Sequence, residues 1–167
     1  RIQLAFINIG GGLGIPYHLD DLPLNLSELG KHATALIKEF GQNNGYMPAL
    51  HMESGRYMTG PHGVLVTRAI NRKDTYRTYI GVDASMSALM RPGMYGSYHH
   101  MTVAGKINER RSAIVDVTGS LCENNDKFAI QRPLPHIDVG DLIIIHDTGA
   151  HGHSMGFNYN GRLRPQE

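Results

Sequence analysis

The first 53 residues alternate between two short apolar runs and one stretch with helical spacing. The apolar runs, at residues 4–7 and 47–53, have the length of strands. Between them the apolar positions recur at intervals of three and four residues, at Leu29, Ala33, Leu36, Ile37 and Phe40. This spacing predicts an amphipathic helix that starts at Ser27 and ends near Gly41. We therefore expect a β-α-β unit in which a buried strand at residues 4–7 lies parallel to the second strand.

The pattern changes near residue 60 to β-rich runs that are separated by turn residues. Four such runs cover residues 64–70, 78–83, 113–118 and 142–146. No stretch of long helical spacing interrupts them. We therefore expect an α/β part in residues 1–60 and a mainly antiparallel β domain, a barrel or a sandwich, in residues 61–167.

Composition and charge narrow the class of partner. The net charge of the 167 residues is +1, with acidic and basic residues mixed along the chain. No basic stripe therefore favours nucleic acid or a membrane surface, and the longest apolar runs are too short to span a membrane. The single cysteine, Cys122, excludes an internal disulfide and favours a reducing compartment. We expect a cytoplasmic protein with a small-molecule ligand.

Three consecutive glycines, Gly10, Gly11 and Gly12, follow the first predicted strand. Such a turn can adopt positive φ and present bare N–H groups to a phosphate. A dinucleotide-binding fingerprint is excluded because Ile15 and Tyr17 stand where it requires glycine, and no Gly-Lys-Ser/Thr follows. A phosphate turn like those of barrel enzymes remains, beside the alternative of a turn that is glycine-rich for steric reasons only.

Charged residues also follow the second predicted strand, where Glu53 and Arg56 flank Gly55. Barrel enzymes place ligand-binding groups at the carboxyl ends of their strands. The position therefore suggests a binding role, and a local ion pair between Glu53 and Arg56 is the alternative.

Two further pairs in the β region carry possible chemistry. Arg91 and Tyr95 could grip a carboxylate through a guanidinium and a phenol, or they could be a surface arginine and a half-buried tyrosine. Cys122 stands beside Glu123, which would not lower the pKa of the thiol, so a proton donor is favoured over a thiolate nucleophile. The alternative is that Cys122 is a small buried hydrophobic residue.

Several histidines raise the question of a metal. His151 and His153 lie two residues apart, and His146 or the pair His99 and His100 could join them. No zinc-finger or His-Glu-x-x-His spacing is present, so we expect no metal site.

Taken together and in order, six motifs resemble one family. They lie at residues 8–17, 53–56, 82–84, 91–99, 122–123 and 146–150, and they are similar to diaminopimelate decarboxylase, a pyridoxal-phosphate enzyme of the alanine-racemase-like barrel class. The resemblance implies that residues 1–60 are the last β-α-β portion of a cofactor-binding (β/α)8 barrel, and that residues 61–167 are most of a C-terminal β domain. It implies a carbon–carbon lyase of lysine biosynthesis that converts meso-diaminopimelate into L-lysine and CO2.

The resemblance also assigns roles to residues. It implies that the cofactor site contains the phosphate-binding glycines, the acid that faces the pyridine nitrogen, and its motif partners: Gly10, Gly11, Gly12, Glu53, Gly55 and Arg56. The distal carboxylate of the substrate would be held by Arg56, Arg91 and Tyr95. Cys122 would donate the proton and Glu123 would contact the distal ammonium, both from the other subunit of a homodimer.

Two departures from the family pattern matter. His151 stands where the family usually has a tyrosine that meets the cofactor, and we expect the imidazole to contact cofactor and substrate in its place. None of the lysines has the context of the family lysine that binds the cofactor covalently: Lys31, Lys38, Lys73, Lys106 and Lys127. We therefore expect about the first half of the enzyme to be missing, this polypeptide alone to be inactive, and its parent to decarboxylate.

Other functions remain open. A related decarboxylase could act on carboxynorspermidine, ornithine, lysine or arginine, although only carboxynorspermidine among these has a distal carboxylate. A non-catalytic paralogue and a plain phosphate-binding or structural β module are the remaining alternatives.

Overall fold

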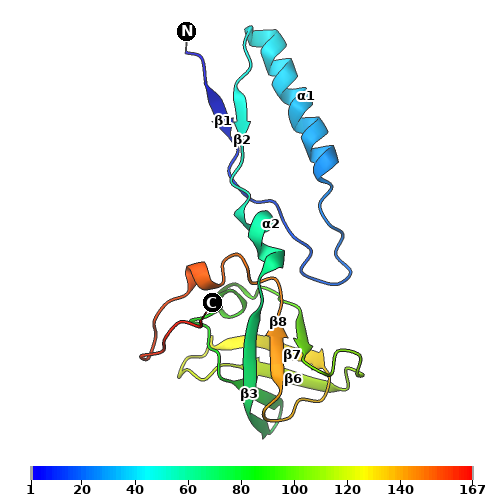
Figure 1. Ribbon diagram of the computed structural model, residues 1–167, viewed down its shortest axis with the longest axis vertical. Coiled ribbons are helices and arrows are strands. Elements are labelled where there is room, and N and C mark those ends of the chain that lie inside the picture. Colours follow the sequence, from blue (N-terminus) through cyan, green and yellow to red (C-terminus); the bar gives the residue numbers. More distant parts are fainter. Residues whose placement is uncertain (1, 167) are drawn as a thin grey trace.

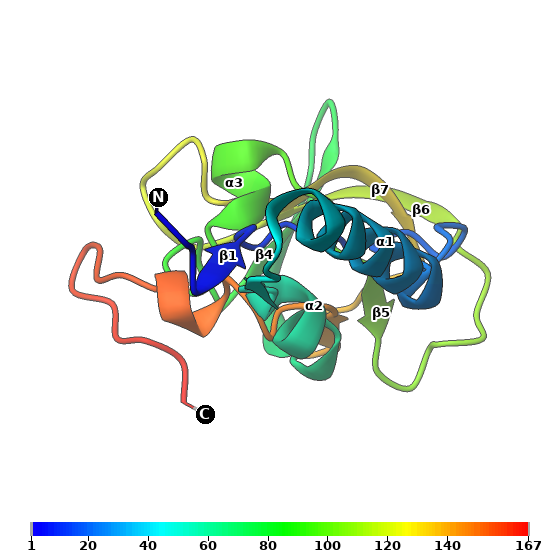
Figure 2. The same cartoon turned by 90° about the horizontal axis from the view of Figure 1, so that it is seen from above.

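The computed structural model describes residues 2–166 and shows an extended part above a compact one (Figure 1). We call residues 2–59 the stem and residues 60–166 the sheet domain. The stem contains β1 (Phe6–Asn8), α1 (Leu26–Asn44), β2 (Ala49–His51) and α2 (Gly55–Thr59). Seen along the long axis, β1, α1 and α2 project over the sheet domain (Figure 2).

The predicted β-α-β unit is confirmed. β1 and β2 pair in parallel, with Phe6 opposite Ala49 and Asn8 opposite His51. The helix α1 begins after Asn25, whose side chain accepts a hydrogen bond of 3.2 Å from the N–H of Glu28. It does not end near Gly41 as expected.

The helix continues to Asn44 because its stop signal comes four residues later than predicted. Gly45 adopts a left-handed conformation with φ 76° and donates to the carbonyl of Gly41, as helix-terminating glycines do. Gly41 instead lies where the Met47 side chain packs so closely that a Cβ atom would collide with it. Gly41 therefore allows close packing of Met47 against the helix and does not end the helix.

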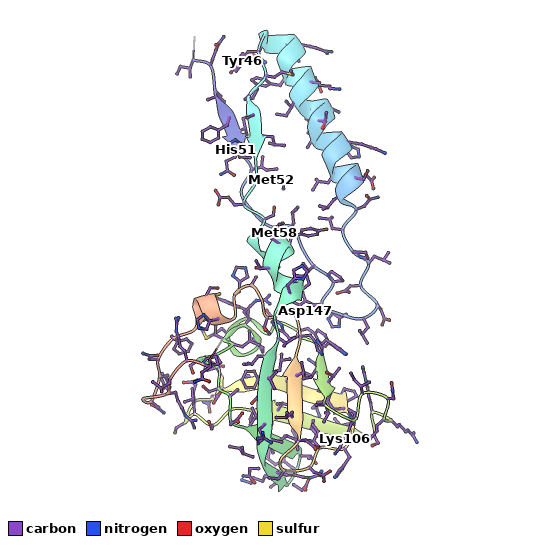
Figure 3. The ribbon with its side chains drawn as sticks, viewed as in Figure 1. Tyr46, His51, Met52, Met58, Lys106 and Asp147 are labelled. Carbon is purple, nitrogen blue, oxygen red and sulfur yellow. The ribbon has the colours of Figure 1, made fainter. Side chains whose placement is uncertain are left out.

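The expectation of a buried first strand is wrong for the described chain. Leu4 is 48% exposed and Phe6 is 53% exposed, and α1 contains no buried residue. The apolar positions of α1 border an open cavity of about 690 Å³ that β2 and α2 also line. Figure 3 places Met52 and Met58 of its lining along the stem. The stem therefore has apolar surface but no closed core.

The sheet domain is a six-stranded mixed sheet. Its strands, β3 (Leu65–Asp74), β4 (Thr78–Val82), β5 (Met101–Val103), β6 (Ala113–Thr118), β7 (Lys127–Leu134) and β8 (Leu142–Ile145), lie in the order β5-β8-β3-β4-β6-β7. All neighbouring pairs are antiparallel except β4 and β6, so the expected mainly antiparallel arrangement is confirmed. The edge strands β5 and β7 contact each other, and the sheet is therefore nearly closed.

Two strands escaped prediction. β5 has only three residues, which is too short for a periodic pattern. β7 contains Pro133, and a proline normally argues against a central strand. The structure respects that rule, because β7 lies at the edge of the sheet.

Apart from α1, the helices are short. They are α2, η1 (Gly60–His62), α3 (Arg91–Tyr95) and η2 (His153–Met155). Between residues 2 and 166, the structure has no helix with the length and apolar character needed to cross a lipid bilayer.

The buried apolar core lies inside the curved sheet. Its fourteen residues come from all six strands and from the segments beside them, and they include Ile80, Leu89, Phe128, Ile137 and Ile143. The side chains of β6 alternate only in part: Val115 and Val117 are buried and Ile114 is 55% exposed, but Asp116 between the valines is also buried and accepts hydrogen bonds from Arg77 and Gln131. This core holds the loops that carry the candidate site.

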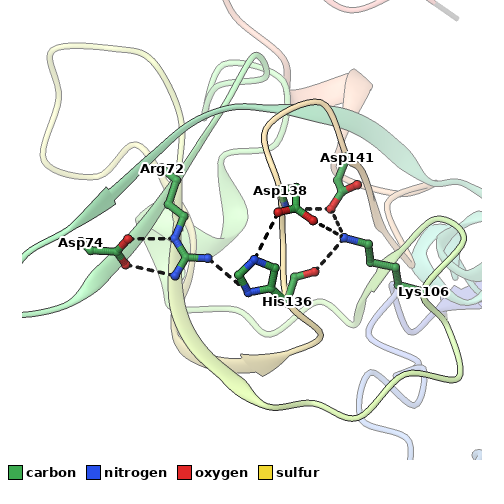
Figure 4. Close-up of polar contacts among 6 residues, drawn as sticks. All are labelled: Arg72, Asp74, Lys106, His136, Asp138 and Asp141. Carbon is green, nitrogen blue, oxygen red and sulfur yellow. Dashed lines mark hydrogen bonds and ion pairs between the residues drawn. The ribbon is translucent and has the colours of Figure 1, made fainter.

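An ion network closes the end of the sheet domain opposite the stem (Figures 3 and 4). Lys106 Nζ donates to Asp138 Oδ2 at 2.9 Å and to Asp141 Oδ2 at 2.7 Å, and the two carboxylates raise the pKa of Lys106. Arg72 pairs with Asp74 nearby. The contacts of Lys106 link the β5–β6 loop to the β7–β8 loop. Lys106 therefore has a structural role.

Candidate active site

The glycine turn follows β1 and lies beside the segment that joins β2 to α2. Gly10 and Gly12 have φ values of 73° and 100°, which L side chains rarely adopt. Gly11 packs against β2's continuation, since a Cβ atom there would lie 2.5 Å from the backbone oxygen of Glu53. Within residues 2–166, the N–H groups of Gly11 and Gly12 have no hydrogen-bond acceptor. The turn is therefore built by glycine and presents free donors, as a phosphate requires.

Asn8 ties this turn to Glu53. Its Oδ1 accepts from the N–H of Gly10 at 2.8 Å, and its Nδ2 donates to Glu53 Oε1 at 2.6 Å. The N–H of Glu53 also donates to the carbonyl of Gly10 at 2.8 Å. The alternative of a Glu53–Arg56 ion pair is not what the structure shows, because the partner of the carboxylate is Asn8. Asn8 belongs to the motif at residues 8–17, but the sequence pattern predicted no role for it.

Arg56 lies in the first turn of α2, beside the loop that follows β8. A Cβ atom built on Gly60 would lie 3.6 Å from Arg56 Cγ and 3.9 Å from Ala150 Cβ. The loop is fixed by two backbone hydrogen bonds, from Thr148 N–H to Gly63 O and from Gly149 N–H to Gly60 O. Figure 3 shows Asp147 at this junction between the stem and the sheet domain.

His151 follows this loop and lies near two arginines. Burial and the charges of Arg56 and Arg91 together lower the pKa of His151. The residue has a φ of 60°, an uncommon conformation for histidine. Residues predicted to bind ligand from α2, α3 and the β8 loop thus lie near one another, and the positive charges of the two arginines favour an anion.

Arg91 is buried at the start of α3, with 7% of its surface exposed. Its Nη1 donates to Tyr17 Oη at 2.9 Å and to His99 Nε2 at 2.8 Å. Tyr95, at the other end of α3, is 62% exposed. The alternative of a surface arginine beside a half-buried tyrosine is therefore wrong. Tyr17 and His99 lie within the motifs at residues 8–17 and 91–99, but their spacing from Arg91 did not predict them as its partners.

The loop that carries Cys122 and Glu123 joins β6 to β7. Cys122 is exposed, so the alternative of a buried hydrophobic cysteine is wrong. Glu123 Oε1 accepts from the N–H of Asn125 at 3.0 Å. The loop is anchored by buried Asp126, whose carboxylate accepts from the N–H groups of Met86 and Leu121, both at 2.6 Å.

This loop packs against α3, because a Cβ atom on Gly93 would collide with the backbone oxygen of Asn125. Among residues 2–166, neither Cys122 nor Glu123 makes a hydrogen bond, ion pair or ring contact with Arg56, Arg91 or His151. The described chain therefore brings together the glycine turn with Glu53, and it places Arg56 and Arg91 near His151. The Cys-Glu pair lies on the β6–β7 loop and has no polar contact with those three residues.

The histidines considered as metal ligands have other contacts. His99 bonds Arg91, and His146 Nε2 lies 2.9 Å from Thr102 Oγ1. In the part of the chain that the structure describes, no three side chains of His, Cys, Asp or Glu are grouped as metal ligands would be.

Comparison with protein families gives one match. Residues 27–149 match the model of the pyridoxal-dependent decarboxylase C-terminal sheet domain. This range includes α1 except for its first residue, together with β2 and all six strands of the sheet domain.

Curated relatives cover nearly the whole chain. Protein TabA of Pseudomonas amygdali pv. tabaci is 57% identical over 99% of this chain and 39% of its own length. Diaminopimelate decarboxylase of Methanothermobacter thermautotrophicus is 42% identical over the same shares. The Escherichia coli K12 enzyme of that name is 36% identical over 96% of this chain and 41% of its own. The chain thus spans about two fifths of the length of these relatives.

Solved structures agree. The crystal structure of diaminopimelate decarboxylase from Methanocaldococcus jannaschii is 36% identical, with a TM-score of 0.89 over 98% of this chain and 37% of that one. The enzyme from Helicobacter pylori, in complex with L-lysine, is 29% identical, with a TM-score of 0.84 over 98% of this chain and 39% of that one.

Proposed function

Because this chain belongs to the family of pyridoxal-dependent decarboxylases, we propose that the complete protein converts meso-diaminopimelate into L-lysine and CO2. The resemblance stated from the six motifs is thereby confirmed at the level of the family. The observation that carries the proposal is the buried guanidinium of Arg91, oriented by Tyr17 and His99, because a substrate with a distal carboxylate needs a fixed cationic partner.

The stem fits the phosphate and the ring of pyridoxal phosphate. The free N–H groups of Gly11 and Gly12 suit the phosphate, and the backbone at Gly10 and Gly12 leaves open space where side chains would stand. Glu53, held by Asn8, supplies a carboxylate for the pyridine nitrogen. When bound, the cofactor supplies the electron sink for the electrons that loss of CO2 leaves behind. In this proposal residues 1–60 are part of a (β/α)8 barrel, whose other strands would cover the apolar surface of the stem.

The substrate's retained carboxylate would be held by Arg56, Arg91 and Tyr95. Arg91 is buried and oriented by two hydrogen bonds, so little side-chain entropy is lost when it binds a ligand. His151 lies beside both arginines, where burial and the arginine charges favour the neutral imidazole. A neutral imidazole can donate one hydrogen bond to a phosphate or carboxylate without adding a third full charge.

Cys122 and Glu123 would act from the partner subunit of a homodimer. Cys122 would donate its thiol proton to the carbon that lost CO2, and Glu123 would accept hydrogen bonds from the distal ammonium. The proposal is supported by the exposure of the thiol and by the absence, among residues 2–166, of a polar contact between this pair and Arg56, Arg91 or His151. A cytoplasmic location fits the single cysteine.

The test begins with the complete protein, its intact mass and its visible absorbance with added pyridoxal phosphate. CO2 release is then measured with meso-diaminopimelate, carboxynorspermidine, ornithine, lysine and arginine as separate substrates. We expect a visible absorption band of bound pyridoxal phosphate. We also expect kcat/KM to be higher for meso-diaminopimelate than for the other four substrates. Preference for carboxynorspermidine would move the proposal to that substrate, and cofactor binding without CO2 release from any of the five would indicate a non-catalytic paralogue.

A second measurement tests the role of this chain by itself. The 167-residue polypeptide, prepared alone, is expected to release no CO2 from meso-diaminopimelate, because none of its lysines has the context needed to bind the cofactor covalently. Turnover by this polypeptide would contradict that part of the proposal.

A further inference from the structure

His99 is the most completely buried polar side chain near the candidate site, with 0% of its surface exposed. Its two ring nitrogens have different partners. Nδ1 lies 2.9 Å from the backbone carbonyl of His146, and Nε2 lies 2.8 Å from Arg91 Nη1. A histidine with both nitrogens occupied in the interior has a fixed orientation.

These partners also fix the tautomer. A backbone carbonyl only accepts hydrogen bonds, so Nδ1 carries the proton. A guanidinium only donates, so Nε2 offers its lone pair to Arg91. Burial and the charges of Arg91 and Arg132 lower the pKa of His99 to about 4, which keeps the ring neutral and Nε2 available as an acceptor near pH 7.

The consequence for Arg91 follows from counting its donors. Both hydrogens of Nη1 are used, one toward His99 and one toward Tyr17 Oη. Within residues 2–166, Nε and Nη2 donate to no acceptor, and the only buried side-chain polar atom without a partner is Ser54 Oγ. Nε and Nη2 therefore each retain some solvent-accessible surface, although Arg91 as a whole is buried. They form the side edge of the guanidinium, which matches a carboxylate in bidentate fashion.

The surroundings hold His99 in place. Arg132 Nη1 donates to the backbone carbonyl of His99 at 2.9 Å, and its guanidinium lies 4.0 Å from the centre of the Tyr98 ring. His18 stacks on the same ring at 3.7 Å between centroids. The segment that contains Tyr17 thus packs next to His99. This packing places Tyr17 Oη and His99 Nε2, the two acceptors of Arg91 Nη1, beside each other.

We propose that His99 is a positioning residue for substrate binding: it engages Nη1 of Arg91 and so turns the Nε and Nη2 edge toward the carboxylate that the product retains. This inference rests on the proposed function of Arg91 as the carboxylate ligand. It assigns His99 no contact with the substrate and no part in proton transfer.

Two substitutions separate the two hydrogen bonds of His99. His99→Gln can place an acceptor oxygen near the position of Nε2, whereas His99→Asn can keep a donor near Nδ1 but does not reach Arg91. His136→Asn is the control, because His136 lies in the ion network at the far end of the sheet domain (Figure 4). All are made in the complete, cofactor-loaded protein, and each variant's melting temperature is measured.

The probes are L-lysine, which retains the carboxylate, and cadaverine, the diamine of the same chain length that lacks it. We expect His99→Asn to weaken L-lysine binding in calorimetry by about tenfold, to raise the KM for meso-diaminopimelate by a similar factor, and to change kcat less than twofold. Cadaverine binding should stay unchanged. His99→Gln should stay within about threefold of the wild type, and His136→Asn should match the wild type.

Several outcomes would overturn the inference. These are an unchanged affinity of His99→Asn for L-lysine, an equal loss for L-lysine and cadaverine, or a His99→Gln variant as weak as His99→Asn. If His99→Asn fails to fold, Tyr17→Phe removes the other acceptor of the same nitrogen and should weaken L-lysine binding a few fold. No change in that variant would be equally decisive against the inference.

The outcomes also separate this inference from the proposed function. A wild-type protein that binds L-lysine but does not decarboxylate meso-diaminopimelate would refute the reaction and leave the comparison of His99 variants valid. A wild-type protein that discriminates in no way between L-lysine and cadaverine would overturn the role of His99.

Discussion

Replacing Asp126 with alanine should both destabilise the protein and slow its reaction. The carboxylate is 4% exposed and accepts hydrogen bonds from Met86 N–H and Leu121 N–H, both at 2.6 Å. It thereby fixes the loop that carries Cys122 and Glu123 to the segment after β4. Removing it leaves two backbone donors without their acceptors.

The magnitude follows from these two donors. An unsatisfied buried donor costs about 1–3 kcal/mol, so the pair corresponds to about 2–6 kcal/mol. Burial raises the pKa of Asp126, which means that part of the hydrogen-bond energy offsets the cost of burying the charge. We therefore expect Asp126→Ala to lose about 2–4 kcal/mol of unfolding free energy. Asp126→Asn, which keeps one acceptor oxygen, should lose less.

The assay is urea unfolding of the complete protein, followed by kcat and KM for meso-diaminopimelate at a temperature where each variant is folded. Asp138→Ala is the control, because the side chain of Asp138 is 64% exposed and its ion pair with Lys106 is worth at most about 1 kcal/mol. In Asp126→Ala we expect kcat to fall, since the loosened loop no longer holds Cys122. A stability loss no larger than that of Asp138→Ala would refute the anchoring role, and an unchanged kcat in a destabilised variant would refute its link to Cys122.

Four further results are expected in the complete protein. Arg91→Ala should raise the KM for meso-diaminopimelate by the equivalent of about 2–3 kcal/mol, because the carboxylate loses a bidentate partner, and an unchanged KM would refute that assignment. Cys122→Ala should lower kcat and preserve the visible absorbance of the cofactor; mixing it with subunits that lack the cofactor-binding lysine should restore part of the activity, and no recovery would indicate a site within one chain. Gly11→Ala should weaken pyridoxal phosphate binding in a spectroscopic titration, since its Cβ would lie 2.5 Å from Glu53 O, whereas unchanged affinity would contradict the tight packing of the turn. Lowering the pH from 6.5 to 4 should reduce the unfolding free energy by up to about 3 kcal/mol through His99, because the unfolded chain takes up this proton below 6.5 and the folded protein only near its lowered pKa of about 4. His99→Gln should flatten this part of the pH dependence in denaturation curves, and an equally steep curve would contradict the burial argument.

The sequence predicted those strands and turns whose residues form a strong local pattern. The β-branched run at residues 113–118 coincides with β6, and the glycine turn follows β1 as expected. The end of α1 was misplaced because Gly41 and Gly45 look alike in the sequence, although only Gly45 adopts positive φ. Such conformations depend on the packing of Met47 against the helix, which a pattern of single residues does not contain.

Burial was harder to predict than strand position. The apolar run at residues 4–7 suggested a buried strand. Hydrophobicity shows only that burial of these side chains would be favourable, not that other residues of the described chain bury them. The partners of Arg91 were missed for a related reason. Tyr17 and His99 lie 74 and 8 residues away, and no spacing rule connects an arginine in a short helix with a tyrosine after a glycine turn.

The difference between the stem and the sheet domain has a consequence for how this chain acquires its structure. The sheet domain has a core of fourteen buried residues, whereas α1 has none, and an isolated 19-residue helix is marginal in water. Backbone amides of α1 should therefore exchange with deuterium much faster than those of β6 unless other protein surface covers them. Along these residues the stem is synthesised before the sheet domain, but it contains no core of its own. We therefore expect the sheet domain to fold before the stem is stably covered, which reverses the order in which the two parts are made.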